Sequence, residues 1–87
     1  MKIKSGFIVR EIAGECVVVA LGEASKIFNG IIKLNDTGKI MWEKLASGCE
    51  KEEVIDAIMQ EYDVEYKRVE ADFEQFVKTL EGANILE

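Results

Sequence analysis

Histidine and cysteine carry much of the chemistry that proteins perform, and this sequence offers neither in a usable pattern. It contains no histidine, which excludes His-based acid–base catalysis and the Ser–His and Cys–His nucleophile pairs. Its two cysteines, Cys16 and Cys49, lie far apart and belong to no CxxC spacing, so zinc and iron–sulfur sites lack ligands. We expect Cys16 to be a small buried residue of a strand, and Cys49, which has no accompanying base, to be structural.

Glycines and carboxylates are the other residues whose arrangement could indicate catalysis. The glycines form neither a GxGxxG fingerprint nor a Walker loop. The 17 Asp and Glu residues would need a cleft for paired-carboxylate catalysis, and an 87-residue chain has little room to build one. The sequence therefore predicts that the protein is not an enzyme and that it has no catalytic residue, no metal site and no cofactor.

The elements that would position any binding residues divide at the start of a capped helix. Asn35 and Asp36 carry side-chain acceptors suited to capping a first helical turn, and Trp42, the only tryptophan, lies on the helix that follows. We assign these three residues to architecture rather than to binding. The residues before the cap have the pattern of a sheet, and those after it the pattern of helices.

The residues before the cap predict a small antiparallel sheet. Runs rich in β-branched and apolar residues alternate with turn residues. Asn29-Gly30 is a strong hairpin signal, but Ile27-Phe28 is short for a partner strand, so a loop or bulge is preferred there. The expected elements are a strand over 6–12, a tight connection over 13–15, a strand over 16–21, a polar link over 23–26 and a strand over 31–34.

Apolar residues at helical spacing predict three helices after the cap. The first covers 36–46, the second starts near Glu50, and the third runs from about 66 to 80 and is terminated by Gly82. The terminal Ile85-Leu86 could return to the core. The expected fold class is α+β: one domain over residues 1–87, winged helix-turn-helix-like, with three antiparallel strands followed by three α-helices.

Charge is unevenly divided along the chain. The net charge is −6, of which residues 1–48 carry +2 and residues 49–87 carry −8. The outer face of the third helix holds more carboxylates than cations and would repel phosphates, so no nucleic-acid partner is expected and a degenerate winged-helix transcriptional regulator is only the alternative. No secretory signal and no bilayer-length apolar run is present, so we expect a cytoplasmic location and no membrane partner.

A three-stranded sheet has two edges, and an open edge can take a strand from another chain. Main-chain hydrogen bonds along the edge would supply affinity. The third strand, over 31–34, is the candidate edge, with the third helix as the other wall of a groove. The alternative for Ile31, Ile32, Phe73 and Phe76 is ordinary core. Self-association through a strand edge, giving a homodimer, also stays open.

An ordered set of residues resembles one known family, the PqqD-like proteins. The likeness covers roughly residues 6–87, and its first matching motif is the Leu-Asn-x-Thr-Gly signature. The matching residues are, in order, Leu34-Asn35-Asp36-Thr37-Gly38, Ile40, Trp42, Leu45, Gly48, Val54-Ile55, Ile58, Tyr62, Val64, Val69, Asp72-Phe73, Phe76-Val77, Leu80 and Ile85-Leu86. The chain departs from the family at Cys49-Glu50, where a small polar residue and Thr are usual, so the second helix lacks a standard Ser/Thr cap.

This resemblance implies both a fold and a function. PqqD-like proteins, named after a chaperone of pyrroloquinoline quinone (PQQ) biosynthesis, have the fold of the recognition element for ribosomally synthesised and post-translationally modified peptides (RiPPs). It implies a non-catalytic peptide chaperone that binds the leader of a precursor peptide by strand addition and presents it to a modifying enzyme, often a radical-SAM enzyme with a SPASM domain. A general protein-interaction module is a further alternative. The likeness does not separate quinone-cofactor, lasso-peptide and other pathways.

The resemblance and the open-edge argument together give one candidate site. The third strand would offer backbone pairing, and the third helix would line the facing wall, with Phe73 and Phe76 partly as core. Asp72 would contact a basic leader residue or make a helix-to-loop hydrogen bond. The expected peptide-binding residues are Ile31, Ile32, Lys33, Leu34, Arg68, Asp72, Phe73 and Phe76.

Overall fold

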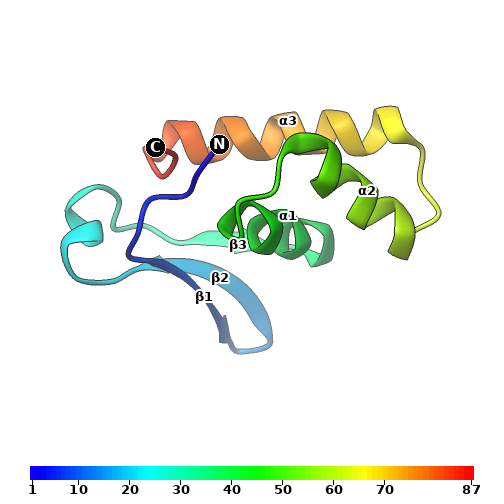
Figure 1. The fold of residues 1–87 in the computed structure, drawn as a ribbon. Helices are drawn as coiled ribbons and strands as arrows, with labels where there is room; N and C mark the ends of the chain where they lie inside the picture. The colour runs from blue at the N-terminus through cyan, green and yellow to red at the C-terminus, as the bar shows by residue number, and fades with distance from the viewer.

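Three short strands form an antiparallel sheet in the computed structural model, which describes residues 1–87. Strand β1 (Phe7–Ile12) pairs with β2 (Glu15–Ala20), and β2 pairs with β3 (Ile32–Leu34). The order β1-β2-β3 leaves β1 and β3 as the two edges (Figure 1). Three α-helices follow the sheet in sequence, so the predicted α+β fold class is confirmed.

The β1–β2 hairpin turns on only two residues. Ala13 (φ 53°) and Gly14 (φ 82°) both have positive φ, as the tight hairpin turn that matches strand twist requires. Glycine adopts this conformation without steric cost, whereas Ala13 does so at some strain. Because Ile12 pairs directly with Glu15, the latter belongs to β2 and not to the connection in which the sequence had placed it.

The link between β2 and β3 differs in detail from the sequence prediction. Residues Gly22–Lys26 form a 3₁₀ helix rather than an irregular polar link. The Asn29-Gly30 pair lies in a loop and not in a hairpin turn, as was preferred. β3 then starts at Ile32, and Ile31 precedes the strand with its side chain 61% exposed. The predicted third strand was therefore one residue too long.

The three helices follow their predicted order. Helix α1 spans Asp36–Ala46, α2 spans Lys51–Glu61 and α3 spans Tyr66–Gly82, so α3 ends two residues later than expected. α2 begins without a Ser/Thr cap. Instead, the side chain of Glu53 accepts a hydrogen bond from the Glu50 backbone N–H at 3.0 Å, which satisfies one free donor of the first turn.

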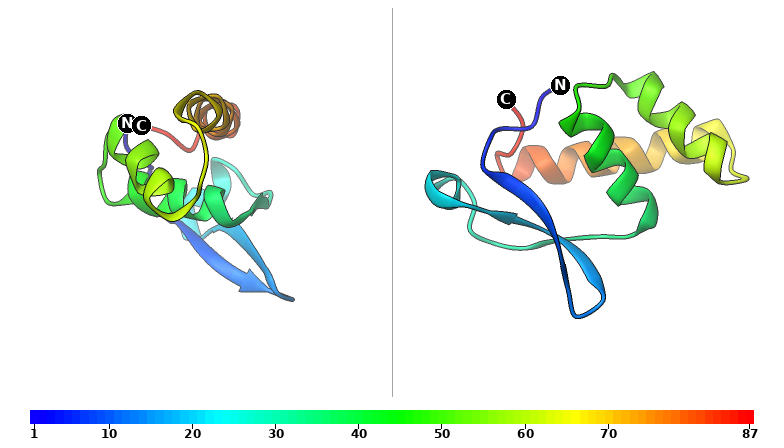
Figure 2. Two further views of the ribbon diagram at one scale, coloured as in Figure 1. Left: turned by 90° about the vertical axis from the view of Figure 1, so that its right-hand side faces the viewer. Right: turned by 60° about the horizontal axis from the view of Figure 1, so that its bottom comes forward.

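Both chain ends come together beside the end of α3 (Figures 1 and 2). The Lys4 N–H donates to the Ile85 carbonyl at 2.8 Å, and the Glu87 N–H donates to the Lys2 carbonyl at 2.8 Å. Ile85 is fully buried, which confirms that the C-terminus returns to the core.

One face of the sheet and the inner faces of the helices enclose a single hydrophobic core. Trp42, which we assigned to architecture, is buried in it at 4% exposure. The buried residues are Phe7, Val18, Ala24, Leu34, Met41, Trp42, Leu45, Val54, Ile55, Ile58, Val69, Phe73, Leu80 and Ile85. The helices cover this face alone. The edge of β3 is free because β3 pairs only with β2, and it lies beside α3 and the start of α1.

Candidate functional site

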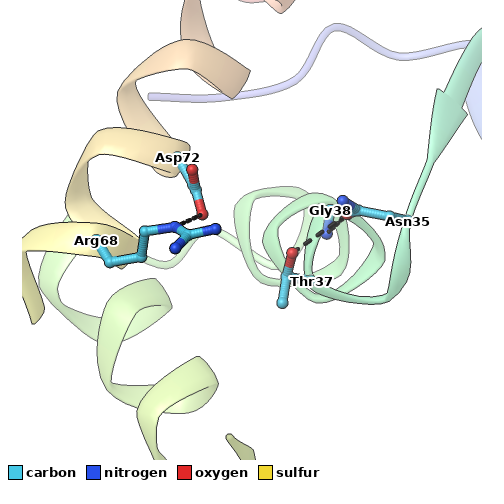
Figure 3. Close-up of polar contacts among 5 residues, drawn as sticks. All are labelled: Asn35, Thr37, Gly38, Arg68 and Asp72. Atoms are coloured by element: carbon cyan, nitrogen blue, oxygen red, sulfur yellow. Dashed lines mark hydrogen bonds and ion pairs between the residues drawn. The ribbon is translucent and has the colours of Figure 1, made fainter. Parts of the chain in front are cut away.

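The turn from β3 into α1 fixes the centre of the candidate site. Asn35 caps α1: its Oδ1 accepts hydrogen bonds from the Gly38 N–H at 2.8 Å and from Thr37 Oγ1 at 3.2 Å (Figure 3). A Cβ at Gly38 would lie 3.0 Å from that oxygen, so glycine permits the close approach. The cap stabilises the turn between β3 and α1, whose residues line the same depression.

A first depression lies where β3 ends, facing Phe76 of α3. Its volume is ≈ 560 Å³. Leu34 is buried and Phe76 is half-buried, so both contribute apolar surface at the depression. Lys33 lies 3.4 Å from Glu15 as an exposed ion pair, which contributes little to stability. The lining residues are Gly14, Glu15, Cys16, Lys33, Leu34, Asn35, Asp36, Gly38 and Phe76.

A second depression, of ≈ 270 Å³, continues along α3 toward its start. Arg68 and Asp72 form an ion pair there, with Arg68 Nε 3.7 Å from Asp72 Oδ2 and both side chains largely exposed. Asp72 makes no hydrogen bond to a loop in this structure, and its polar contact is the ion pair with Arg68. The lining residues are Asn35, Thr37, Met41, Ile58, Val64, Arg68, Val69 and Asp72.

Asn35 lines both depressions, and we call the two together the α3 groove. Positions 68, 72 and 76 are four residues apart, so they lie along one side of α3. The structure therefore brings together five of the predicted residues, namely Lys33, Leu34, Arg68, Asp72 and Phe76.

The other three predicted residues do not line the groove. Phe73 is 1% exposed, belongs to the core, and borders a separate depression together with Lys51 and Lys78 on another side of α3. Ile31 is exposed but lies outside β3, whereas Ile32 lies within the strand and packs partly against the core. Phe73 thus fills the core part of its expected role and not the wall.

Several lining residues were not predicted from the sequence to bind a peptide. Thr37 and Val64 border the second depression, and Asp36 and Glu15 border the first. Val64 had a detectable signal, because it is an apolar residue between Asp63 and Glu65 in the link between two helices. In the structure it is 37% exposed. Met41 and Ile58 gave no such signal, since their apolar spacing is explained by core packing alone.

Two polar contacts tie α3 to α2 on the side away from the groove. Tyr66 Oη donates a hydrogen bond of 2.6 Å to Glu52, and this bond raises the pKa of Tyr66 to about 12. Lys51 Nζ lies 2.7 Å from Glu70, and its hydrogen bond to that carboxylate raises the pKa of Lys51. These contacts position α3 and leave its groove side free.

The structure contains no cluster of ligands suited to a metal ion. No group of three or more His, Cys, Asp and Glu side chains converges. Cys16 and Cys49 are both free and partly buried, and Cys49 Sγ lies 3.5 Å from Ser47 Oγ. None of the helices is long and apolar enough to cross a membrane.

Comparison with known proteins fits this geometry. The family model described as coenzyme PQQ synthesis protein D (PqqD) matches residues 15–86. The solved structure of TbiB1 in complex with the TbiA(beta) leader peptide is 31% identical, with a TM-score of 0.79, over 100% of this chain and 95% of that chain. Lasso peptide synthetase B1 complexed with the leader peptide shares the fold, at 22% identity and a TM-score of 0.74, over 98% and 93% of the two chains. No curated protein sequence gives a significant match. This chain therefore belongs to the PqqD family.

Proposed function

We propose that this protein binds the leader segment of a ribosomally made precursor peptide as an additional strand on β3, and presents the peptide to a modifying enzyme. The observation that carries the proposal is the free edge of β3 beside the α3 groove. A leader strand placed there would gain main-chain hydrogen bonds from the edge and side-chain contacts from the groove.

The edge of β3 has unpaired backbone groups to offer. β3 pairs with β2 on one side only. No backbone hydrogen bond from a turn or loop involves residues 29–34. Each hydrogen bond that an added strand makes would contribute about 0.5–1.5 kcal/mol net, so a short leader strand would bind weakly without further contacts.

The groove supplies those further contacts, and it distinguishes β3 from the other edge strand, β1. None of the four depressions on the molecule is lined by a β1 residue. Alternate residues of an added strand would point toward α3, where Phe76 and Val64 offer apolar surface. The exposed Arg68–Asp72 pair could exchange its partner for a charged leader side chain.

The relatives support the same class of ligand. The TbiB1 structure, at 31% identity, contains a bound leader peptide, and so does that of lasso peptide synthetase B1. We extend the ligand class, a leader peptide, to this chain and propose a non-catalytic role. The resemblance to PqqD-like proteins favours a radical-SAM enzyme with a SPASM domain as the modifying partner. No observation favours the winged-helix regulator, since α3 is acidic outside the core.

Alternate N-methylation of the leader tests strand addition. The probe is a fluorescent peptide with the leader sequence of the precursor encoded beside this chain, titrated by anisotropy. In an antiparallel or parallel pair only every second N–H points at the neighbouring strand. We therefore expect N-methyl groups at alternate positions to weaken binding about tenfold or more and those between them to have little effect. Equal losses at successive positions would contradict strand addition, and no binding of the unmodified leader would contradict the proposed function.

A further inference from the structure

The sheet face that points away from the helices carries apolar side chains that no helix covers. Strand alternation places Ile8, Val17 and Val19 on this face. None of the three belongs to the main core cluster or packs against it, although Val17 is buried and Ile8 and Val19 are half-buried. The helices all lie on the opposite side of the sheet (Figures 1 and 2). We call this surface the outer sheet face.

Strand register arranges the outer sheet face in three rows. Ile8 pairs with Val19, and continuing the β2–β3 register by one residue places the exposed Ile31 on the other side of Val19. The second row is Arg10, Val17 and Lys33, and the third, beside the hairpin turn, is the exposed Ile12 with Glu15. Val17 is only 4% exposed although no helix lies over it, which fits cover by the aliphatic parts of its long cationic neighbours.

The charge on the outer sheet face is positive and partly uncompensated. Arg10 makes no ion pair, whereas Lys33 is paired with Glu15. The first 48 residues, which include the sheet, carry +2, and the remainder carries −8. An acidic protein surface would thus be attracted to the sheet side of the molecule and repelled from the helical side.

The size of the outer sheet face limits the partners that it fits. Strand spacing and rise give it an area of about 300 Å², whereas a stable interface needs about 800 Å² on each partner. A second copy of the chain would be held too weakly by this face alone. It suits a partner that is also held by a second attachment, because tethering raises the effective concentration of a weak contact to the millimolar range.

We infer that the outer sheet face is the docking surface for the peptide-modifying enzyme. The matching surface of the enzyme would be an apolar patch bordered by carboxylates that face Arg10. This inference rests on the proposed function, in which the precursor peptide is the second attachment: its leader lies on β3 and its core lies in the enzyme. A leader strand added next to Ile31 and Lys33 also widens the outer sheet face by one strand, so the enzyme would bind the peptide-loaded protein better than the free one.

The test separates leader binding from enzyme docking. Two variants are made: the double substitution Ile8→Thr, Val19→Thr, which keeps β-branched side chains in the sheet, and Arg10→Glu. The matched control is Leu21→Thr, at an exposed apolar residue outside the strands. Each is assayed for leader affinity by anisotropy, and for the modification rate of the precursor by the enzyme encoded beside this chain, at sub-saturating concentration.

We expect both outer-face variants to bind the leader within about twofold of the wild type and to lower the modification rate about tenfold, equal to about 1.4 kcal/mol. The control should retain the full rate. The loss in Arg10→Glu should diminish at high salt as its charge is screened. Wild-type modification rates with wild-type leader affinity in both variants would overturn the inference and leave leader binding intact. A wild-type chain that binds no leader would overturn both. If circular dichroism shows the double variant unfolded, Arg10→Glu decides alone.

Discussion

Removal of the α1 cap should destabilise the protein by an amount that the structure allows us to estimate. In Asn35→Ala, the Gly38 N–H loses its acceptor at 2.8 Å and Thr37 Oγ1 loses a partner at 3.2 Å. The hydroxyl is exposed and can bond to water, so the loss is mainly that of the cap, about 1 kcal/mol. For a domain of this size that loss lowers Tm by about 4–8 °C.

Thermal unfolding followed by circular dichroism measures this loss, and urea titration gives the free energy of unfolding independently. The control is Asn35→Asp, in which a carboxylate oxygen takes the place of the accepting amide oxygen. This substitution also places negative charge at the start of a helix, which is favourable. We expect Asn35→Asp to unfold within about 0.5 kcal/mol of the wild type. An Asn35→Ala protein as stable as Asn35→Asp would refute the cap as the element that fixes the β3–α1 turn.

Three further predictions concern α3. Phe73→Ala, in the core at 1% exposure, should cost about 3–5 kcal/mol in urea unfolding, and a cost below that of Phe76→Ala would contradict the burial order. Phe76→Ala should instead weaken leader binding about tenfold in an anisotropy titration, with Val77→Ala, which borders a different depression, as the control that keeps wild-type affinity. The raised pKa of Tyr66 stabilises the fold fully below about pH 10, and this contribution is lost as pH rises through about 12; Tyr66→Phe should therefore lose less stability than the wild type between these pH values in chemical denaturation, and equal losses would contradict the Glu52 hydrogen bond.

Sequence patterns predict the elements well where one physical signal dominates. The Asn35 cap, the glycine in the β1–β2 turn and the apolar spacing of the helices each act locally, so the strands and helices lie close to their expected bounds. The 3₁₀ helix at Gly22–Lys26 was not expected, because five residues are too few to show a helical period. The prediction for the start of α2 was also incomplete, because it did not include the Glu53 side chain, which accepts a hydrogen bond where a Ser/Thr cap is missing.

The site is less predictable because its residues share signals with the core. Phe73 and Phe76 both lie on the apolar stripe of α3, and only packing decides that Phe73 is at its buried centre and Phe76 at the groove margin. Similarly, Val17 has the pattern of a core residue, yet it lies on the outer sheet face. A hydrophobic period identifies a buried face, whereas the side on which a helix covers a sheet is a tertiary property.

The most direct test of leader recognition is a backbone amide NMR titration of the protein with the leader peptide encoded beside it. We expect chemical-shift changes concentrated at residues 32–34 and at Arg68, Asp72 and Phe76, with β1 unaffected. Shifts along β1 in place of β3, or none at high peptide excess, would contradict the proposed binding site.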